Sequence, residues 1–94
     1  MGAKAPKKIK KATRTVKGHK CVISQPDFKQ ITFGLSALND TSVGDLALAG
    51  KAVYDVCVLE CDQAIKDDAT MLMSICIQIA KEYLLPYQVK IKKN

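Results

Sequence analysis

Aromatic side chains are scarce in this chain of 94 residues: Phe, Trp and Tyr together account for 5%, and there is no Trp. Proteins that hold single-stranded nucleic acid stack its bases on aromatic rings, so this composition argues against a base-stacking surface. Long apolar runs are lacking as well. The longest, Ala69 to Ala80, has about a dozen residues, whereas a helix that spans a membrane needs about 20. The first lysines lead into polar residues rather than an apolar stretch, so we expect no secretory signal and an intracellular protein.

The residue patterns that usually carry catalysis are also lacking. The single histidine, His19, has no acidic residue near it in the sequence. The chain contains no nucleophile motif, no glycine-rich phosphate loop and no pair of carboxylates spaced for acid and base work. The tandem acids Asp67 and Asp68 fit the start of a helix better than a metal site. We therefore expect a protein that is not an enzyme and holds no cofactor.

Four cysteines, Cys21, Cys57, Cys61 and Cys76, allow three interpretations. Cys57 and Cys61 lie four residues apart on an expected helix, and with His19 and Cys21 they could complete a tetrahedral zinc site. A disulfide is disfavoured in an intracellular protein. Because Cys76 lies between isoleucines and no C-x-x-C pair is present, we favour reduced thiols that act as small apolar side chains, and we expect no metal.

The net charge of +6 is unevenly distributed. Residues 1–20 carry eight basic side chains and no acid, whereas residues 21–89 carry four lysines against nine acids. This length allows one domain at most, so we expect a basic, flexible or partly extended arm over 1–20 and a single small helical domain over 21–94 with a basic C-terminal end. The arm could contact nucleic acid, dock on an acidic protein or aid solubility, whereas it lacks the bulky apolar face that binds membranes. Its basic residues are Lys4, Lys7, Lys8, Lys10, Lys11, Arg14, Lys17 and Lys20.

The first part of the domain combines an extended segment with a helix. Residues 12–24 are rich in β-branched side chains around a Lys-Gly pair, which predicts one extended strand or a short hairpin. Asp27 and Gln30 then form a capping pair for a first helix that ends at 39–40. The apolar stripe of this helix consists of Phe28, Ile31, Leu35 and Leu38.

A second helix is expected to begin at Ser42, which pairs with Asp45 as a cap. Its apolar stripe runs from Leu46 to Cys61. Gly44 and Gly50 are small residues that could permit the close approach of another backbone. With a third helix after the acidic joint, the fold class is mainly α: a three-helix small domain, which a short β-hairpin could precede.

The third helix, over 69–85, is capped by Asp67 or Asp68 and ended or kinked by Pro86. It carries apolar side chains on most of its circumference, which two other helices can rarely cover. We therefore expect it to offer a surface to a partner or for self-association, although packing within the core explains the same residues. The residues concerned are Met71, Leu72, Met73, Ile75, Ile77, Ile79 and Leu84.

Two groups of residues point to a family. The second helix carries Ala49 and Gly50 followed by Cys57, and the joint after it carries Asp62 and then Ile65-Lys66-Asp67. In this order, with the helices around them, they make the chain resemble the small helical proteins of phages and prophages of gut Bacteroidetes, a group similar to phage tail assembly chaperones.

The resemblance implies a non-catalytic protein that keeps an apolar tail protein, such as the tape measure, soluble during virion assembly. It would work in the cytoplasm of the bacterial host or become part of the virion. We also expect a homo-oligomer and no membrane association. The alternative is a phage structural or nucleic-acid-associated protein that oligomerises through its helices and contacts DNA through residues 1–20.

Overall fold

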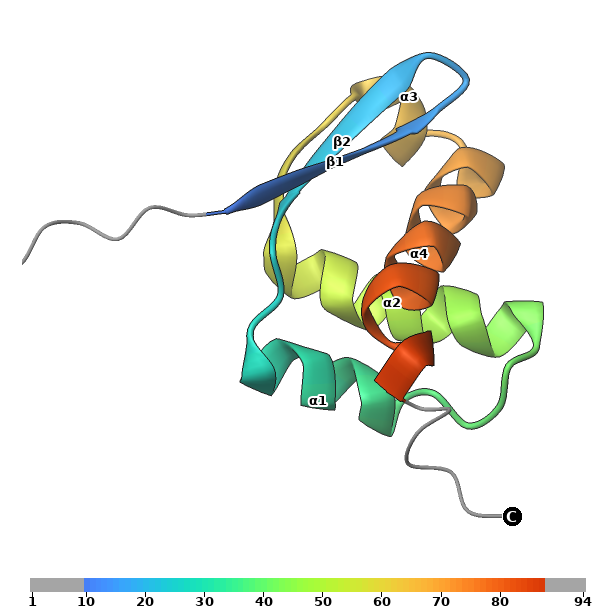
Figure 1. Ribbon diagram of the computed structural model, residues 1–94. Helices are drawn as coiled ribbons and strands as arrows, with labels where there is room; N and C mark the ends of the chain where they lie inside the picture. The colour runs from blue at the N-terminus through green and yellow to red at the C-terminus, as the bar shows by residue number, and fades with distance from the viewer. Residues whose placement is uncertain (1–9, 88–94) are drawn as a thin grey trace, which may run out of the picture.

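The computed structural model describes residues 10–87 and shows a small sheet packed beside crossing helices (Figure 1). Helices α1 and α2 lie side by side, α4 crosses α2, and the hairpin of β1 and β2 lies over α4. None of the helices in this part of the chain is long and apolar enough to cross a membrane. The elements are β1 (Lys11–Val16), β2 (His19–Ser24), α1 (Phe28–Ser36), α2 (Val43–Cys57), β3 (Val58–Cys61), α3 (Gln63–Lys66) and α4 (Ala69–Tyr83).

The hairpin is set by its turn. Lys17 and Gly18 both have positive φ, 49° and 81°, as in the two-residue turns whose twist matches that of antiparallel strands. The register pairs Lys11 with Ser24 at the open end. Residues 11–20, which we assigned to an arm from their charge, therefore form β1, the turn and the start of β2, and residues 1–9 lie outside the described residues.

The expectation of a three-helix domain is wrong, although the fold is mainly α. Helix accounts for 59% and strand for 21% of the described residues, which form five helices, a last turn at 85–87 included, and a three-stranded antiparallel sheet. The predicted second helix ran on to Cys61, but α2 ends at Cys57 and Val58–Cys61 forms β3. Once the hairpin has formed, β2 still has an unpaired edge, and β3 satisfies the hydrogen-bonding groups of that edge.

The starts of the long helices follow capping signals in the sequence. Asp27 accepts a hydrogen bond from the N–H of Gln30 at 2.9 Å, and the Gln30 side chain accepts one from the N–H of Asp27 at 3.0 Å, which completes a capping box. The hydroxyl of Ser42 accepts from the N–H of Asp45, and Asp68 accepts from two N–H groups at the start of α4. The three predicted caps are confirmed.

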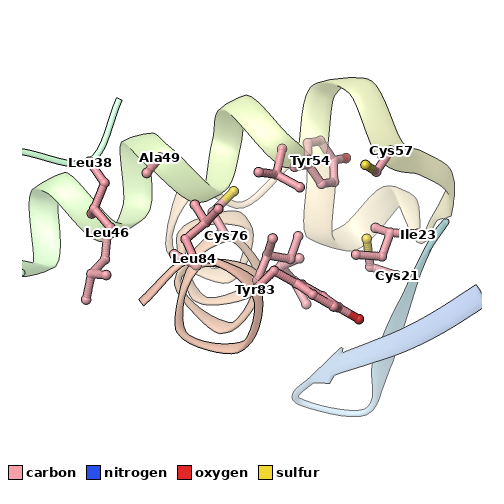
Figure 2. Close-up of a cluster of buried hydrophobic side chains, with 14 of the residues drawn as sticks. Cys21, Ile23, Leu38, Leu46, Ala49, Tyr54, Cys57, Cys76, Tyr83 and Leu84 are labelled. Atoms are coloured by element: carbon pink, nitrogen blue, oxygen red, sulfur yellow. The ribbon is translucent and has the colours of Figure 1, made fainter. Parts of the chain in front are cut away.

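Helix α4 crosses α2 at close range because of Gly50. A Cβ atom at this position would lie 1.8 Å from the carbonyl oxygen of Cys76, so the two backbones touch, as the sequence suggested. Gly34 has a similar role on α1, where a Cβ would lie 2.6 Å from Cγ2 of Val53. The core forms around these contacts (Figure 2). It consists of Cys21, Ile23, Leu38, Leu46, Ala49, Val53, Tyr54, Cys57, Ile65, Ile75, Cys76, Ile79, Ala80, Tyr83 and Leu84.

The hairpin covers a second side of α4. Arg14 on β1 forms an ion pair with Glu82. The side-chain amide of Gln78 donates a hydrogen bond to the carbonyl oxygen of Thr15 at 3.0 Å. Helix α4 is therefore packed against α2 on one side and against the hairpin on another. The hairpin buries apolar side chains of α4 that would be exposed if only the other helices packed against it.

Candidate functional site on helix α1

The apolar surface predicted on the last helix is largely buried. Ile75, Ile79 and Leu84 have no exposed area, so their assignment to a partner surface is wrong: they fill the core between α4, α2 and α1. Met71, Leu72 and Ile77 are partly buried and pack against the same core. Met73 alone of this set is exposed, at 42%. With Ile77 and four polar or charged residues, Thr70, Ser74, Gln78 and Lys81, it lines a shallow hollow on the outer side of α4.

The aromatic side chains are distributed in an unusual way. Both phenylalanines of the chain lie on α1 and are exposed, Phe28 at 80% and Phe33 at 56%. The aromatic residues in the core are instead Tyr54 and Tyr83, at 7% and 9%. Phenylalanine is among the residues most often fully buried, whereas tyrosine is intermediate. A chain with few aromatic residues has therefore placed its two most apolar ones in water.

An apolar groove lies beside Phe28, whereas Phe33 is not among its lining residues. Phe28, Ile31, Thr32 and Leu35 of α1 line it together with Tyr87, which follows α4, and its volume is about 330 Å³. The capping box fixes the start of the helix directly before Phe28, so the groove begins at a defined backbone position. From Phe28 to Leu35 it extends roughly 10 Å along the helix axis.

No protein-family model, curated protein or solved structure matches the chain. The role of the groove therefore follows from the chemistry of the residues that line it.

Sequence reasoning found the apolar stripe of α1 and proposed no binding surface on this helix. Ile31 and Leu35 are partly buried and Leu38 is buried, so most of the stripe does face inward. Phe28 lies at the first residue of the helix, where no other element covers it. Phe33 lies off the stripe, five residues after Phe28, so it is exposed on another face of the helix and does not line the groove. The position of Phe28 directly after the cap is the signal that could have revealed the surface.

A second exposed ridge lies on α2. Leu48 is 67% exposed and Val56 is 50% exposed. With the partly exposed Ala52 they recur every four residues, so they share one face of the helix. Gly50, which faces α4, lies on the other side of α2, so this ridge points away from α4.

The basic residues assigned to the arm separate into three groups. Lys4, Lys7 and Lys8 lie outside the described residues. Arg14 turns toward α4 and pairs with Glu82. Side chains alternate along a strand, so Lys11, Thr13 and Thr15 of β1 share a face, and the register adds Lys20 to it. The exposed lysines of the hairpin and its entry are Lys10, Lys11, Lys17 and Lys20.

The four residues weighed as zinc ligands do not assemble into a site. Among residues 10–87, no group of three or more His, Cys, Asp or Glu side chains is placed to hold a metal. His19 instead has its Nδ1 3.6 Å from a carboxylate oxygen of Asp62. All four cysteines are free, and Cys21, Cys57 and Cys76 are buried among apolar side chains. Burial raises the pKa of Cys57, and it raises the pKa of Cys76 to about 11, so these two thiols stay protonated at neutral pH.

Proposed function

We propose that the chain is a non-catalytic binding protein that holds an apolar helix of a partner protein against α1. The observation that carries this proposal is the 80% exposure of Phe28, which lines a groove with almost no polar lining. Burying a Phe side chain contributes roughly 1.5–3 kcal/mol, so a partner that covers the Phe28 ring gains roughly ten- to a hundredfold in affinity from this contact.

The shape of the groove fits a helix with one apolar face. Its length of roughly 10 Å corresponds to seven residues of a partner helix, so side chains at positions i, i+4 and i+7 could enter together. The hydroxyl groups of Thr32 and Tyr87 are the only side-chain polar groups among its five lining residues. This lining favours aliphatic or aromatic anchors over charged ones.

The phage context of the proposal rests on the resemblance to tail assembly chaperones. In that role the partner would be a helix of the tape-measure protein, held in the host cytoplasm until the tail tube forms around it. Such a partner is long, helical and apolar on one side, which matches what the α1 groove would accept.

Binding of a tape-measure helix from the same genome tests the proposal. We expect a labelled synthetic peptide of that helix to bind the full chain, and Phe28→Ala to weaken binding at least tenfold because one anchor surface is removed. Leu48→Ala is the matched control, because Leu48 is similarly exposed but lies on α2. Equal affinity for wild type and Phe28→Ala, or no binding at all, would contradict the proposal.

A second copy of the chain is the competing occupant of the groove. Light scattering of wild type and Phe28→Ala separates the two cases. A dimer that becomes a monomer on substitution of Phe28 would mean that the groove is a self-association surface. An assembly state unchanged by the substitution leaves the groove free for a partner helix.

The second candidate function is nucleic-acid binding by the hairpin. Its support is the open face of β1 and β2, where Lys11 and Lys20 lie near hydroxyl side chains and neither strand contains an acid. Lys17 adds a charge at the turn. Residues 11–20 form part of the sheet, so the test substitutes residues and does not delete the segment. Lys→Gln at these three positions should reduce the slope of log K against log salt concentration for DNA binding. The expected reduction is about 0.9 for each phosphate that a lysine no longer neutralises. An unchanged slope would exclude the hairpin as the DNA-binding element.

A further inference from the structure

Cys21 and Cys61 are directly opposite each other in the sheet. They are register partners in the antiparallel pairing of β2 with β3. One residue further out, the N–H of Asp62 donates to the carbonyl oxygen of Lys20 at 2.9 Å. Hydrogen-bonded and non-hydrogen-bonded pairs alternate along such a ladder, so the two cysteines occupy a non-hydrogen-bonded position, where Cα atoms are about 4.5 Å apart. That separation lies within the range that a disulfide spans, about 4.4–6.8 Å.

The two side chains point to the same side of the sheet and meet. Cys61 contributes to raising the pKa of both Cys21 and Tyr54, as expected for side chains that are neighbours on this side of the sheet. Cys21 is fully buried, and burial raises its pKa to about 12. Cys61 is partly exposed. The pair therefore combines a partly exposed cysteine with a fully buried one.

We propose that Cys21 and Cys61 are a redox modification site that closes to a cross-strand disulfide on reaction with a low-molecular-weight disulfide such as oxidised glutathione. The site is independent of the α1 groove, so its test does not depend on the proposed function.

The exchange balances in two steps. The partly exposed Cys61 loses its proton and its sulfur attacks oxidised glutathione. This breaks the glutathione disulfide, forms a mixed disulfide and releases one glutathione, which takes up the proton. Cys21 then loses its proton and attacks the sulfur of Cys61, which releases the second glutathione with that proton. The two cysteines are oxidised by two electrons, and one oxidised glutathione becomes two reduced ones.

The disulfide would join β2 and β3, which are otherwise held together by a few backbone hydrogen bonds. β3 has four residues, and its pairing with β2 is irregular between Val22 and Ile23. A disulfide at Cys21 and Cys61 closes a loop that contains α1 and α2. Such a loop restricts the unfolded chain, so oxidation should stabilise the fold.

The test starts from the reduced full chain, incubated with oxidised glutathione and then blocked with N-ethylmaleimide. With the chain unfolded in denaturant for the blocking step, we expect oxidised wild type to carry two N-ethylmaleimide groups where the reduced chain carries four. Cleavage by trypsin alone leaves Cys57 and Cys61 in one peptide, but added cleavage after Glu60 separates them. The linked product should then join peptide 21–29 to peptide 61–66. The thermal midpoint should rise by about 10 °C and return on reduction.

Two substitutions and a control complete the experiment. Cys21→Ser and Cys61→Ser should each abolish the disulfide, whereas Cys57→Ser should still form it. Four unreacted thiols in wild type after prolonged exposure, or a bond that maps to Cys57 or Cys76, would overturn the proposal. The peptide map of wild type decides the question even if a serine variant does not fold.

Discussion

Helices α1 and α4 both carry apolar side chains beyond one buried face, and the two helices differ in what covers the surplus. Helix α4 is packed against α2 at Gly50 and is covered on a second side by the hairpin, through Arg14 and Thr15. Helix α1 packs mainly on α2, and Phe28 and Phe33 stay in water. Surplus apolar side chains on a helix therefore indicate a binding surface only if no other element of the fold covers them.

The largest expected effect concerns the crossing that encloses α4. Gly50→Ala should destabilise the fold by about 3 kcal/mol or more, because the added methyl group would overlap the backbone of Cys76 and force α2 and α4 apart. Urea unfolding followed by circular dichroism measures this. Gly44→Ala is the control, since a Cβ there meets nothing within 4 Å, and it should be neutral or slightly stabilising. A Gly50→Ala variant as stable as wild type would mean that the two helices do not touch in solution.

The second prediction compares the two helices directly. Ile79→Ala on α4 should cost about 2–5 kcal/mol, because it leaves a cavity in the core. Phe33→Ala on α1 should change the free energy of unfolding by about 0.5 kcal/mol or less, because that ring is already exposed. Both values come from the same denaturation experiment. If Phe33→Ala lowers the free energy of unfolding by more than about 1 kcal/mol, the ring is covered in solution. That result would contradict the statement that α1, unlike α4, leaves its surplus apolar side chains exposed.

The smallest expected effect concerns the ion pair that holds the hairpin on α4. The Arg14 and Glu82 side chains are 22% and 48% exposed, so their coupling energy should be about 0.2–1 kcal/mol. A double-mutant cycle with Arg14→Gln and Glu82→Gln measures this energy, which should fall as salt is added. Zero coupling at low salt would indicate that the apolar contacts of β1 hold the hairpin without help from the ion pair.

Local features of the fold were predictable from the sequence because their causes are local. A cap forms between residues two or three positions apart, so Asp27, Ser42 and Asp68 could be recognised without knowledge of tertiary structure. The hairpin turn at Lys17-Gly18 depends on two adjacent residues in the same way. Gly44 and Gly50 were both predicted as positions where another backbone could approach, but only Gly50 has such a contact, because the contact depends on which helix crosses there.

Strand β3 was not predictable by the same reasoning. Residues 58–61 continue the apolar stripe of α2, and only the open edge of β2, far away in the sequence, makes them a strand. The site was misplaced for a related reason. The hairpin was treated as an arm because of its lysines, so it was not counted among the elements that cover Ile75 and Ile79.

The middle strand of the sheet, β2, has consequences for how the chain is made. Its first partner precedes it directly, whereas β3 begins 34 residues after Ser24. At about 5–20 residues per second, one edge of β2 waits roughly two to seven seconds for its partner during translation. Open strand edges pair with other chains, and lysines on or near an edge oppose such pairing. We therefore expect the lysines of β1, the turn and β2 to oppose pairing of this edge with other chains until β3 has been made.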